Sequence, residues 1–135
     1  MKKIVIDTNV LLVSISERSK LHWIFKSLLE GEYGLCVTSS IISEYAEIIG
    51  QHMGSTASND IIGVLENLPN VDLVTTYYKF HLLKDEDDNK FVDCAIAANA
   101  FCIVSHDKDF AILKNIDFPI VSVVNSEQFK QILGK

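Results

Sequence analysis

The sequence predicts an α/β fold in which a parallel sheet is covered by helices on both faces. Short apolar segments rich in β-branched residues alternate with segments of helical periodicity along the 135 residues, as in repeated strand–helix–strand units. Such units are joined by right-handed crossovers, so their strands run parallel. Because neither an internal repeat nor a linker interrupts this pattern, we expect one domain over residues 1–135.

The first strand, predicted over residues 3–6, also supports this fold class. It ends in three consecutive β-branched side chains, which suit a strand buried on both faces. Asp7, Thr8 and Asn9 follow it directly. Ligands of parallel α/β sheets bind outside the carboxyl ends of the strands, and Asp7 would project there. The alternative is that Asp7 or Asn9 only caps the next helix.

The next elements are predicted from helical stripes and from signals at their ends. A helix is expected over residues 19–30, with Gly31 at its end, and a strand over residues 35–37 follows. Thr38, Ser39 or Ser40 then caps a helix that runs to about Gly50. The apolar stripe of the helix over 19–30 consists of Leu21, Ile24, Phe25, Leu28 and Leu29.

The second half continues the alternation. The predicted elements are a helix from Ser58 or Asn59 to Leu68, a strand over 71–75, a helix over 89–101, a strand over 103–105, a short helix from Asp107 through Leu113, a strand over 120–124 and a helix over 126–133. The helix over 89–101 is apolar almost all round, so it should be buried. The four acids before it, residues 85–88, are expected to form mainly a solvated loop.

The composition excludes several classes of protein. Hydrophobic residues make up 48%, with only two prolines and six glycines, so a compact fold is expected. Apolar runs of about five residues are too short to span a membrane, and the N-terminal one is too short for a signal peptide. We therefore expect a cytoplasmic protein with no membrane partner. The net charge of −6 argues against simple electrostatic binding to nucleic acid.

Four carboxylates stand out by their positions in this plan. Asp7 and Asp107 follow predicted strands, Glu44 is near the start of a helix, and Asp93 is inside the buried helix. Because helices in this fold begin where strands end, all four are expected at one edge of the sheet. Each has a structural alternative: Asp7 or Asp107 could cap a helix, Glu44 could be a solvated residue, and Asp93 could have a buried polar partner.

Carboxylates that converge in this way need protons or a cation. Two of them about 5 Å apart repel each other by roughly 3 kcal/mol at an effective dielectric of about 20. Hard carboxylate oxygens, without a set of histidines or cysteines, favour Mg²⁺ or Mn²⁺. One or two such ions would also supply the positive charge that an acidic protein needs to hold a phosphodiester.

Four blocks of sequence carry a family resemblance. They are Ile-Val-Ile-Asp-Thr-Asn-Val-Leu at the start, Ser-Glu-Tyr in the second predicted helix, Asp-Asp-Asn-Lys-Phe-Val-Asp-Cys-Ala-Ile-Ala-Ala, and Ile-Val-Ser-His-Asp-Lys-Asp-Phe. Together they resemble the PIN domain (PilT N-terminus) ribonuclease family, and within it the toxin components of toxin–antitoxin systems. The resemblance covers essentially the whole chain. It implies a three-layer α/β/α arrangement with a five-stranded parallel sheet.

The resemblance also implies an activity, partners and a site. PIN domain ribonucleases cleave RNA with Mg²⁺ or Mn²⁺, and a metal-activated water attacks phosphorus without a covalent nucleophile. The toxins commonly form homodimers and are blocked by a cognate antitoxin. A Thr and a small residue are commoner where this chain has Ser105-His106, which leaves the role of His106 open. The implied metal-binding and catalytic acids are Asp7, Glu44, Asp93 and Asp107, with Asp88 and Asp109 as auxiliaries, and Thr8, Asn9 and Ser105 position ligands or water.

Two other classes of function fit part of the pattern. A non-catalytic RNA- or protein-interaction module of PIN fold could keep the acids for metal-linked stability. A phosphoryl-accepting regulator with a receiver-like sheet also gathers acids at strand ends, but it needs an Asp after a middle strand and a Lys after a late one. Here the strand over 71–75 is followed by Thr76-Tyr77-Tyr78 and the strand over 120–124 by Asn125, which disfavours the regulator.

Overall fold

The computed structural model describes residues 1–135 and has a five-stranded parallel sheet at its centre. Its strands lie in the order β3-β2-β1-β4-β5, and every neighbouring pair is parallel, as the sequence predicts. The strand order reverses between β1 and β4, and ligands of open α/β sheets bind at such a switch point. The strands are β1 (Lys3–Ile6), β2 (Gly34–Val37), β3 (Val71–Leu73), β4 (Cys102–Val104) and β5 (Val123–Val124).

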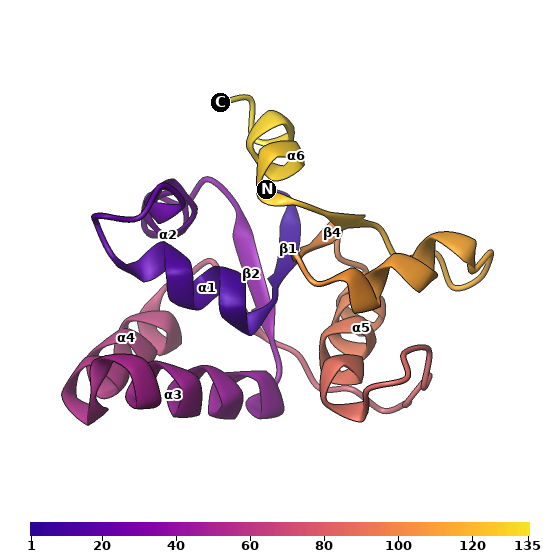
Figure 1. Cartoon of the computed structure of the whole chain (residues 1–135), viewed down its shortest axis with the longest axis horizontal. Helices are drawn as coiled ribbons and strands as arrows, with labels where there is room; N and C mark the ends of the chain where they lie inside the picture. The colour runs from indigo at the N-terminus through magenta and orange to yellow at the C-terminus, as the bar shows by residue number, and fades with distance from the viewer.

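Helices flank the sheet. In Figure 1, α1 to α4 lie on one side of β1 and β2 and α5 lies on the other, while the carboxyl ends of both strands point downward. None of the helices is long and apolar enough to cross a membrane. The helices are α1 (Thr8–Ile15), α2 (His22–Leu29), α3 (Ser39–Met53), α4 (Ser55–Asn67), α5 (Glu86–Ala98), the 3₁₀ helix η1 (Lys108–Asn115) and α6 (Ser126–Ile132).

The hydrophobic core is packed around the central strand β1. Its residues Ile4, Val5 and Ile6 are fully buried, and β2 beside it is buried along its length. The buried Tyr45 of α3 donates a hydrogen bond from its hydroxyl group to the carbonyl oxygen of Ile6. This bond attaches α3 to the last residue of β1, directly beside Asp7.

Helix α1 is the main element that the sequence analysis did not predict. It follows β1 without a loop, because Asp7 is its N-cap. Four of its eight residues form one uninterrupted apolar block, Val-Leu-Leu-Val, so periodicity alone does not separate this helix from a loop or strand. The helix predicted over 19–30 is reduced to α2, because residues 16–21 form turns and bends.

Several other elements begin or end at different residues than predicted. β3 and β5 are shorter, α4 begins at Ser55, and the segment after Asp107 is a 3₁₀ helix. The most important difference is that α5 begins at Glu86 and not at residue 89. Asp85 caps it there, because its Oδ1 accepts a hydrogen bond from the amide of Asp87 at 3.0 Å. The earlier start changes which acids lie in the first turn.

Candidate metal centre

Asp7 lies at the carboxyl end of β1, at the switch point of the sheet. It is only 6% exposed, and both of its carboxylate oxygens are fixed by hydrogen bonds. Oδ1 accepts from the amides of Asn9 at 2.8 Å and Val10 at 3.3 Å, and Oδ2 accepts from the hydroxyl of Ser105 at 2.5 Å. Asp7 therefore does cap α1, yet Oδ2, which accepts only one hydrogen bond, keeps a lone pair for another partner.

Ser105 connects the ends of the two central strands. Its Oγ donates to Asp7, and it also accepts a hydrogen bond from the amide of Asp107 at 3.0 Å. Asp107 in turn caps η1, since its Oδ1 accepts from the amide of Asp109 at 2.9 Å. The loop after β4 is thus attached to the end of β1 through one buried hydroxyl group.

Glu44 reaches the same place from α3. The hydroxyl of Thr8 donates a hydrogen bond to its Oε2, and the ammonium group of Lys90 lies 2.6 Å from its Oε1. The two side chains of this ion pair are 27% and 18% exposed, so water screens them only partly. Glu44 is therefore held between α1 and α5, and it is not the freely solvated helix-edge residue of the alternative interpretation.

Three of the four predicted acids line one pocket, with Asp88 as a fourth. This pocket, of about 180 Å³, is called the acidic pocket below. Asp88 contributes from the first turn of α5. Burial raises the pKa of the Asp88 carboxyl to about 6, with the nearby charges of Asp85, Asp107, Asp109 and Asp7 as further causes. The lining consists of Asp7, Thr8, Asn9, Glu44, Ile48, Asp88, Phe91 and Asp107.

Asp93 does not line the acidic pocket, in contrast to the expected convergence. It follows Asp88 by five residues, which turns it by about 140° around α5. A helix that begins at residue 89, as predicted from the sequence, would have Asp93 in an early turn. Asp93 is buried, and its Oδ1 accepts a hydrogen bond from the amide of Phe80 at 3.1 Å. Burial raises the pKa of Asp93, and the Phe80 amide opposes the change.

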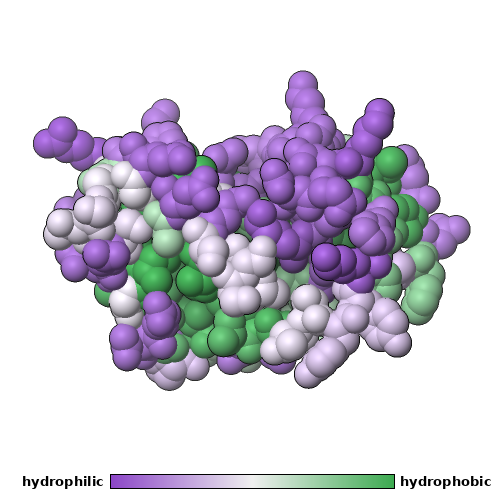
Figure 2. All heavy atoms as spheres, turned by 90° about the horizontal axis from the view of Figure 1, so that it is seen from below, coloured by the Kyte–Doolittle hydropathy of each residue, from purple (hydrophilic) through white to green (hydrophobic).

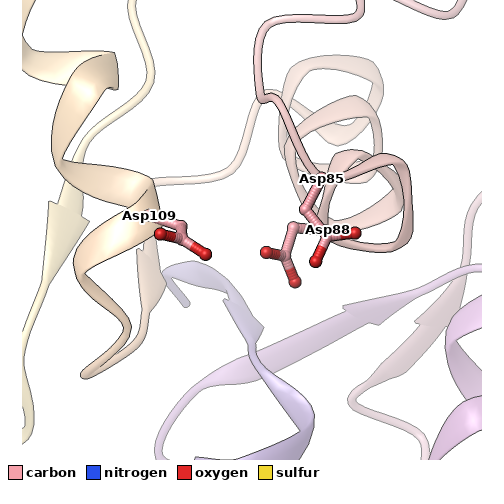
Figure 3. Close-up of side chains that lie close together, drawn as sticks. All are labelled: Asp85, Asp88 and Asp109. Carbon is pink, nitrogen blue, oxygen red and sulfur yellow. The ribbon is translucent and has the colours of Figure 1, made fainter.

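A second group of acids extends the acidic pocket at its rim. Carboxylate oxygens of Asp85, Asp88 and Asp109 lie within 4.8 Å of one another. Figure 3 shows Asp85 and Asp88 at the start of α5, with Asp109 facing them from η1. Asp88 belongs to both groups, whereas the sequence analysis assigned Asp85 to a solvated loop. The signal that could have identified Asp85 is its position as a helix cap three residues before Asp88.

His106 has a structural partner outside the acidic pocket. Its Nε2 accepts a hydrogen bond from the amide of Ser126 at the start of α6, at 3.2 Å. The side chain also lines a neighbouring hollow of about 270 Å³ together with Asp7, Asn9 and Asp107. His106 therefore links the loop after β4 to α6 beside the acids, and it is not in the acidic pocket itself.

The donors in the acidic pocket fit a divalent cation. The ionisable groups that line it are all carboxylates, with no cysteine or histidine among them. Hard oxygen donors of this kind suit Mg²⁺ or Mn²⁺. Burial is the largest cause of the raised pKa of Asp88, and four other carboxylates add to it, so negative charge is gathered around this residue. Lys90 neutralises only Glu44 directly, so a cation would relieve the remaining repulsion.

Comparison with known proteins places this geometry in a family. The sequence matches the PIN domain family over residues 3–109. No curated protein matches the sequence. The chain is similar in structure to VapBC2 from Rickettsia felis, solved bound to a DNA fragment from its promoter, with a TM-score of 0.64 and 15% identity over 91% of this chain and 98% of that chain.

Two further solved structures share the fold. DNA-bound VapBC from Salmonella typhimurium has a TM-score of 0.61 and 13% identity, over 93% of this chain and 99% of that chain. The PIN domain of human SMG5 has a TM-score of 0.54 and 12% identity, over 96% of this chain and 98% of that chain. At such low identities these structures establish the shared fold alone.

Proposed function

The chain belongs to the PIN domain family, and we propose that it is a metal-dependent endoribonuclease that acts at the acidic pocket. The observation that supports this most strongly is that Asp7, Glu44, Asp88 and Asp107, from four separate segments, line one pocket. A protein of net charge −6 gains nothing in folding from gathering these charges. Their convergence is explained if the pocket holds a cation.

The four acids of the pocket would hold Mg²⁺ or Mn²⁺, as one ion or two, with Asp85 and Asp109 at the rim. When bound, the cation supplies positive charge for the phosphodiester and lowers the pKa of water for hydrolysis. The proposal replaces Asp93 by Asp88, because Asp93 lies outside the pocket and already accepts the Phe80 amide.

The other residues of the site hold these acids in position. Ser105 and the amides of Asn9 and Val10 fix the orientation of the Asp7 carboxylate. Thr8 directs Glu44 toward the pocket from α1. Lys90 pairs with Glu44 and adds the one cationic group in direct contact with these acids, where it can attract an RNA phosphate.

Cleavage of end-labelled single-stranded RNA tests the proposal. We expect cleavage with Mn²⁺ or Mg²⁺, none with EDTA, and a loss of at least about 100-fold in rate for Asp7→Asn. Asp60→Asn is the matched control, because Asp60 is an exposed carboxylate on α4. Circular dichroism should show that both variants remain folded. Cleavage by Asp7→Asn at the parental rate would rule out the acidic pocket as the active site.

We further propose that the protein is a toxin with a cognate antitoxin and that it forms a homodimer. The likeness of its fold to the VapBC structures supports this proposal. Induction of the parent in bacterial cells should arrest growth, whereas Asp7→Asn should not. Growth at the same rate with both proteins would contradict the toxin assignment. Sedimentation of the purified chain would test the homodimer.

A second candidate function is a non-catalytic interaction module of the same fold. The ion pair between Lys90 and Glu44 favours it, because it neutralises one of the acids without a metal. This candidate predicts that Mn²⁺ raises the melting temperature while RNA is not cleaved. The cleavage assay above therefore separates the two candidates.

A further inference from the structure

The segment between β3 and α5 exposes aromatic side chains. It contains the sequence Tyr77-Tyr78-Lys79-Phe80 and no regular secondary structure. Tyr77 is 87% exposed and Tyr78 is 76% exposed, and the rings of Tyr78 and Phe80 are 6.4 Å apart. Large exposed aromatic rings that do not pack against the core mark surfaces that bind something else.

This aromatic loop, residues 77–80, borders a cleft of about 440 Å³. The cleft lies between the start of α3, the end of β3 and the first turns of α5. Lys79 lines it from the loop, and Lys90 lines it from α5. Because Lys90 also pairs with Glu44 at 2.6 Å, one side chain connects the cleft to the acidic pocket.

The loop is attached to the helix that carries the active-site acids. The amide of Phe80 donates to Asp93, and Asn89 binds both the amide and the carbonyl of Leu83 at 2.9 and 3.0 Å. Asp93, which the acidic pocket does not use, thus holds the aromatic loop in place. The backbone at Phe80 and Leu83 is therefore fixed relative to α5.

The lining of the cleft favours a nucleotide chain over a protein partner. Only two of its 14 lining residues, Leu73 and Val74, are hydrophobic, whereas a protein interface needs an apolar centre. Figure 2 views the molecule from below and shows a broad band of hydrophilic residues along one side of this face, with apolar residues on the other. The hydroxyl side chains of the cleft are Thr38, Ser39, Ser40, Thr75 and Thr76, and they can bind phosphate, sugar and base edges.

The charge of the cleft is mixed, so the affinity for a nucleotide chain must come from the stacking of bases on aromatic rings. Lys79 and Lys90 are balanced by Glu86, Asp87 and Asp93 in the same lining. Single-stranded nucleic acid binds such surfaces when its bases stack on aromatic rings. We propose that the cleft and the aromatic loop bind the single-stranded RNA next to the cleaved bond, with bases stacked on Tyr77 and Tyr78 and a phosphate on Lys79. This inference rests on the proposed ribonuclease function and names its substrate-binding surface.

The test measures binding apart from cleavage. Fluorescence anisotropy of a labelled single-stranded oligoribonucleotide is followed with the Asp7→Asn protein, which holds the RNA uncut. We expect replacement of both Tyr77 and Tyr78 by Ala to raise Kd by about 30-fold, which is about fivefold for each ring. Replacement of both by Phe should restore binding. Phe118→Ala is the matched control, because Phe118 is an aromatic residue that is 90% exposed elsewhere.

Salt dependence gives a second and independent readout. Lys79→Gln should lower the slope of log Kd against log salt by about 0.7, the value for one phosphate contact on a single strand. The tyrosine variants should keep the parental slope, because stacking releases no counterions.

Three outcomes would overturn the inference. The first is an unchanged Kd in the double Ala variant. If that variant also had an altered elution volume in gel filtration, the rings would belong to a contact between protein chains. The second is an equal loss of binding in Phe118→Ala or in the double Phe variant. The third is no RNA binding by the Asp7→Asn protein. If the parent did not cleave RNA but binding still depended on the two tyrosines, only the proposed catalytic function would be contradicted.

Discussion

The two sides of helix α5 carry the same kind of side chain with different neighbours. On one side, Asp88 faces other carboxylates across the acidic pocket, and its pKa rises to about 6. On the other side, the more deeply buried Asp93 faces the polar cleft and accepts a backbone amide. Burial raises the pKa of both, so a raised pKa alone does not identify a metal ligand. The neighbours distinguish the two residues: Asp88 is surrounded by other carboxylates, whereas Asp93 has a structural partner.

The largest effect on the pocket side is expected for Ser105→Ala. This change removes the hydroxyl that orients Asp7 and accepts the Asp107 amide. We expect kcat/KM for RNA cleavage to fall by about 10- to 100-fold, as for other groups that orient metal ligands. Ser105→Thr should restore much of the rate because it keeps the hydroxyl. Ser122→Ala is the matched control, since Ser122 is exposed; an equal rate in Ser105→Ala and the control would contradict the role of Ser105.

The corresponding change on the cleft side is Asp93→Ala. It leaves the Phe80 amide without its acceptor, which should lower the free energy of unfolding by about 1 kcal/mol. Asp93→Asn keeps an acceptor oxygen and should unfold at nearly the parental denaturant concentration. Urea denaturation measures both variants. Equal destabilisation by Ala and Asn would indicate that the charge of Asp93, and not its hydrogen bond, stabilises the fold.

Lys90 lies between the pocket side and the cleft side of α5, and we expect its replacement to have a smaller effect than that of Ser105. Lys90→Gln deletes the cation that competes for Glu44. We expect the Kd for Mn²⁺, measured by calorimetry, to decrease by up to about fivefold, the range of a partly exposed ion pair. Lys26→Gln is the control, because Lys26 forms an exposed pair with Glu30 on α2. A weaker affinity for Mn²⁺ in Lys90→Gln would show that Lys90 organises the pocket and does not compete for it.

A further expected effect is the pH dependence of stability due to Asp88. In EDTA, the unfolded chain loses this proton near the ordinary pKa of 3.8, whereas the folded protein holds it until about pH 6. The free energy of unfolding should therefore decrease as the pH rises through this window. Asp88→Asn should remove that part of the slope and raise the melting temperature at pH 7 by a few degrees. An unchanged pH profile in this variant would contradict the crowding of negative charge around Asp88.

The fold and most of the candidate pocket could be predicted from the sequence. The alternation of apolar and amphipathic segments is sufficient for a parallel sheet. A carboxylate directly after a buried strand is sufficient for Asp7, and one in the short loop after such a strand is sufficient for Asp107. Glu44 was also placed at the correct edge, because the start of its helix was predicted within one residue of the observed start, Ser39.

The rest depends on helix phase and on contacts between distant segments. A difference of three residues in the start of α5 exchanges Asp93 for Asp88, and this start is set by the cap at Asp85. Helix α1 has no stripe that periodicity could detect. The ion pair of Lys90 with Glu44 joins residues 46 positions apart, and the Phe80 to Asp93 bond orders a loop that has no sequence signal of its own.

Calorimetric titration of Mn²⁺ into the parent, Asp88→Asn and Asp93→Asn tests directly whether Asp88, and not Asp93, binds the metal ion. It compares the two sides of α5 with the same substitution and requires no RNA substrate. We expect Asp88→Asn to weaken Mn²⁺ binding by about tenfold or more and Asp93→Asn to keep the parental affinity within about twofold. Weaker binding in Asp93→Asn with parental affinity in Asp88→Asn would contradict this expectation and return Asp93 to the metal site.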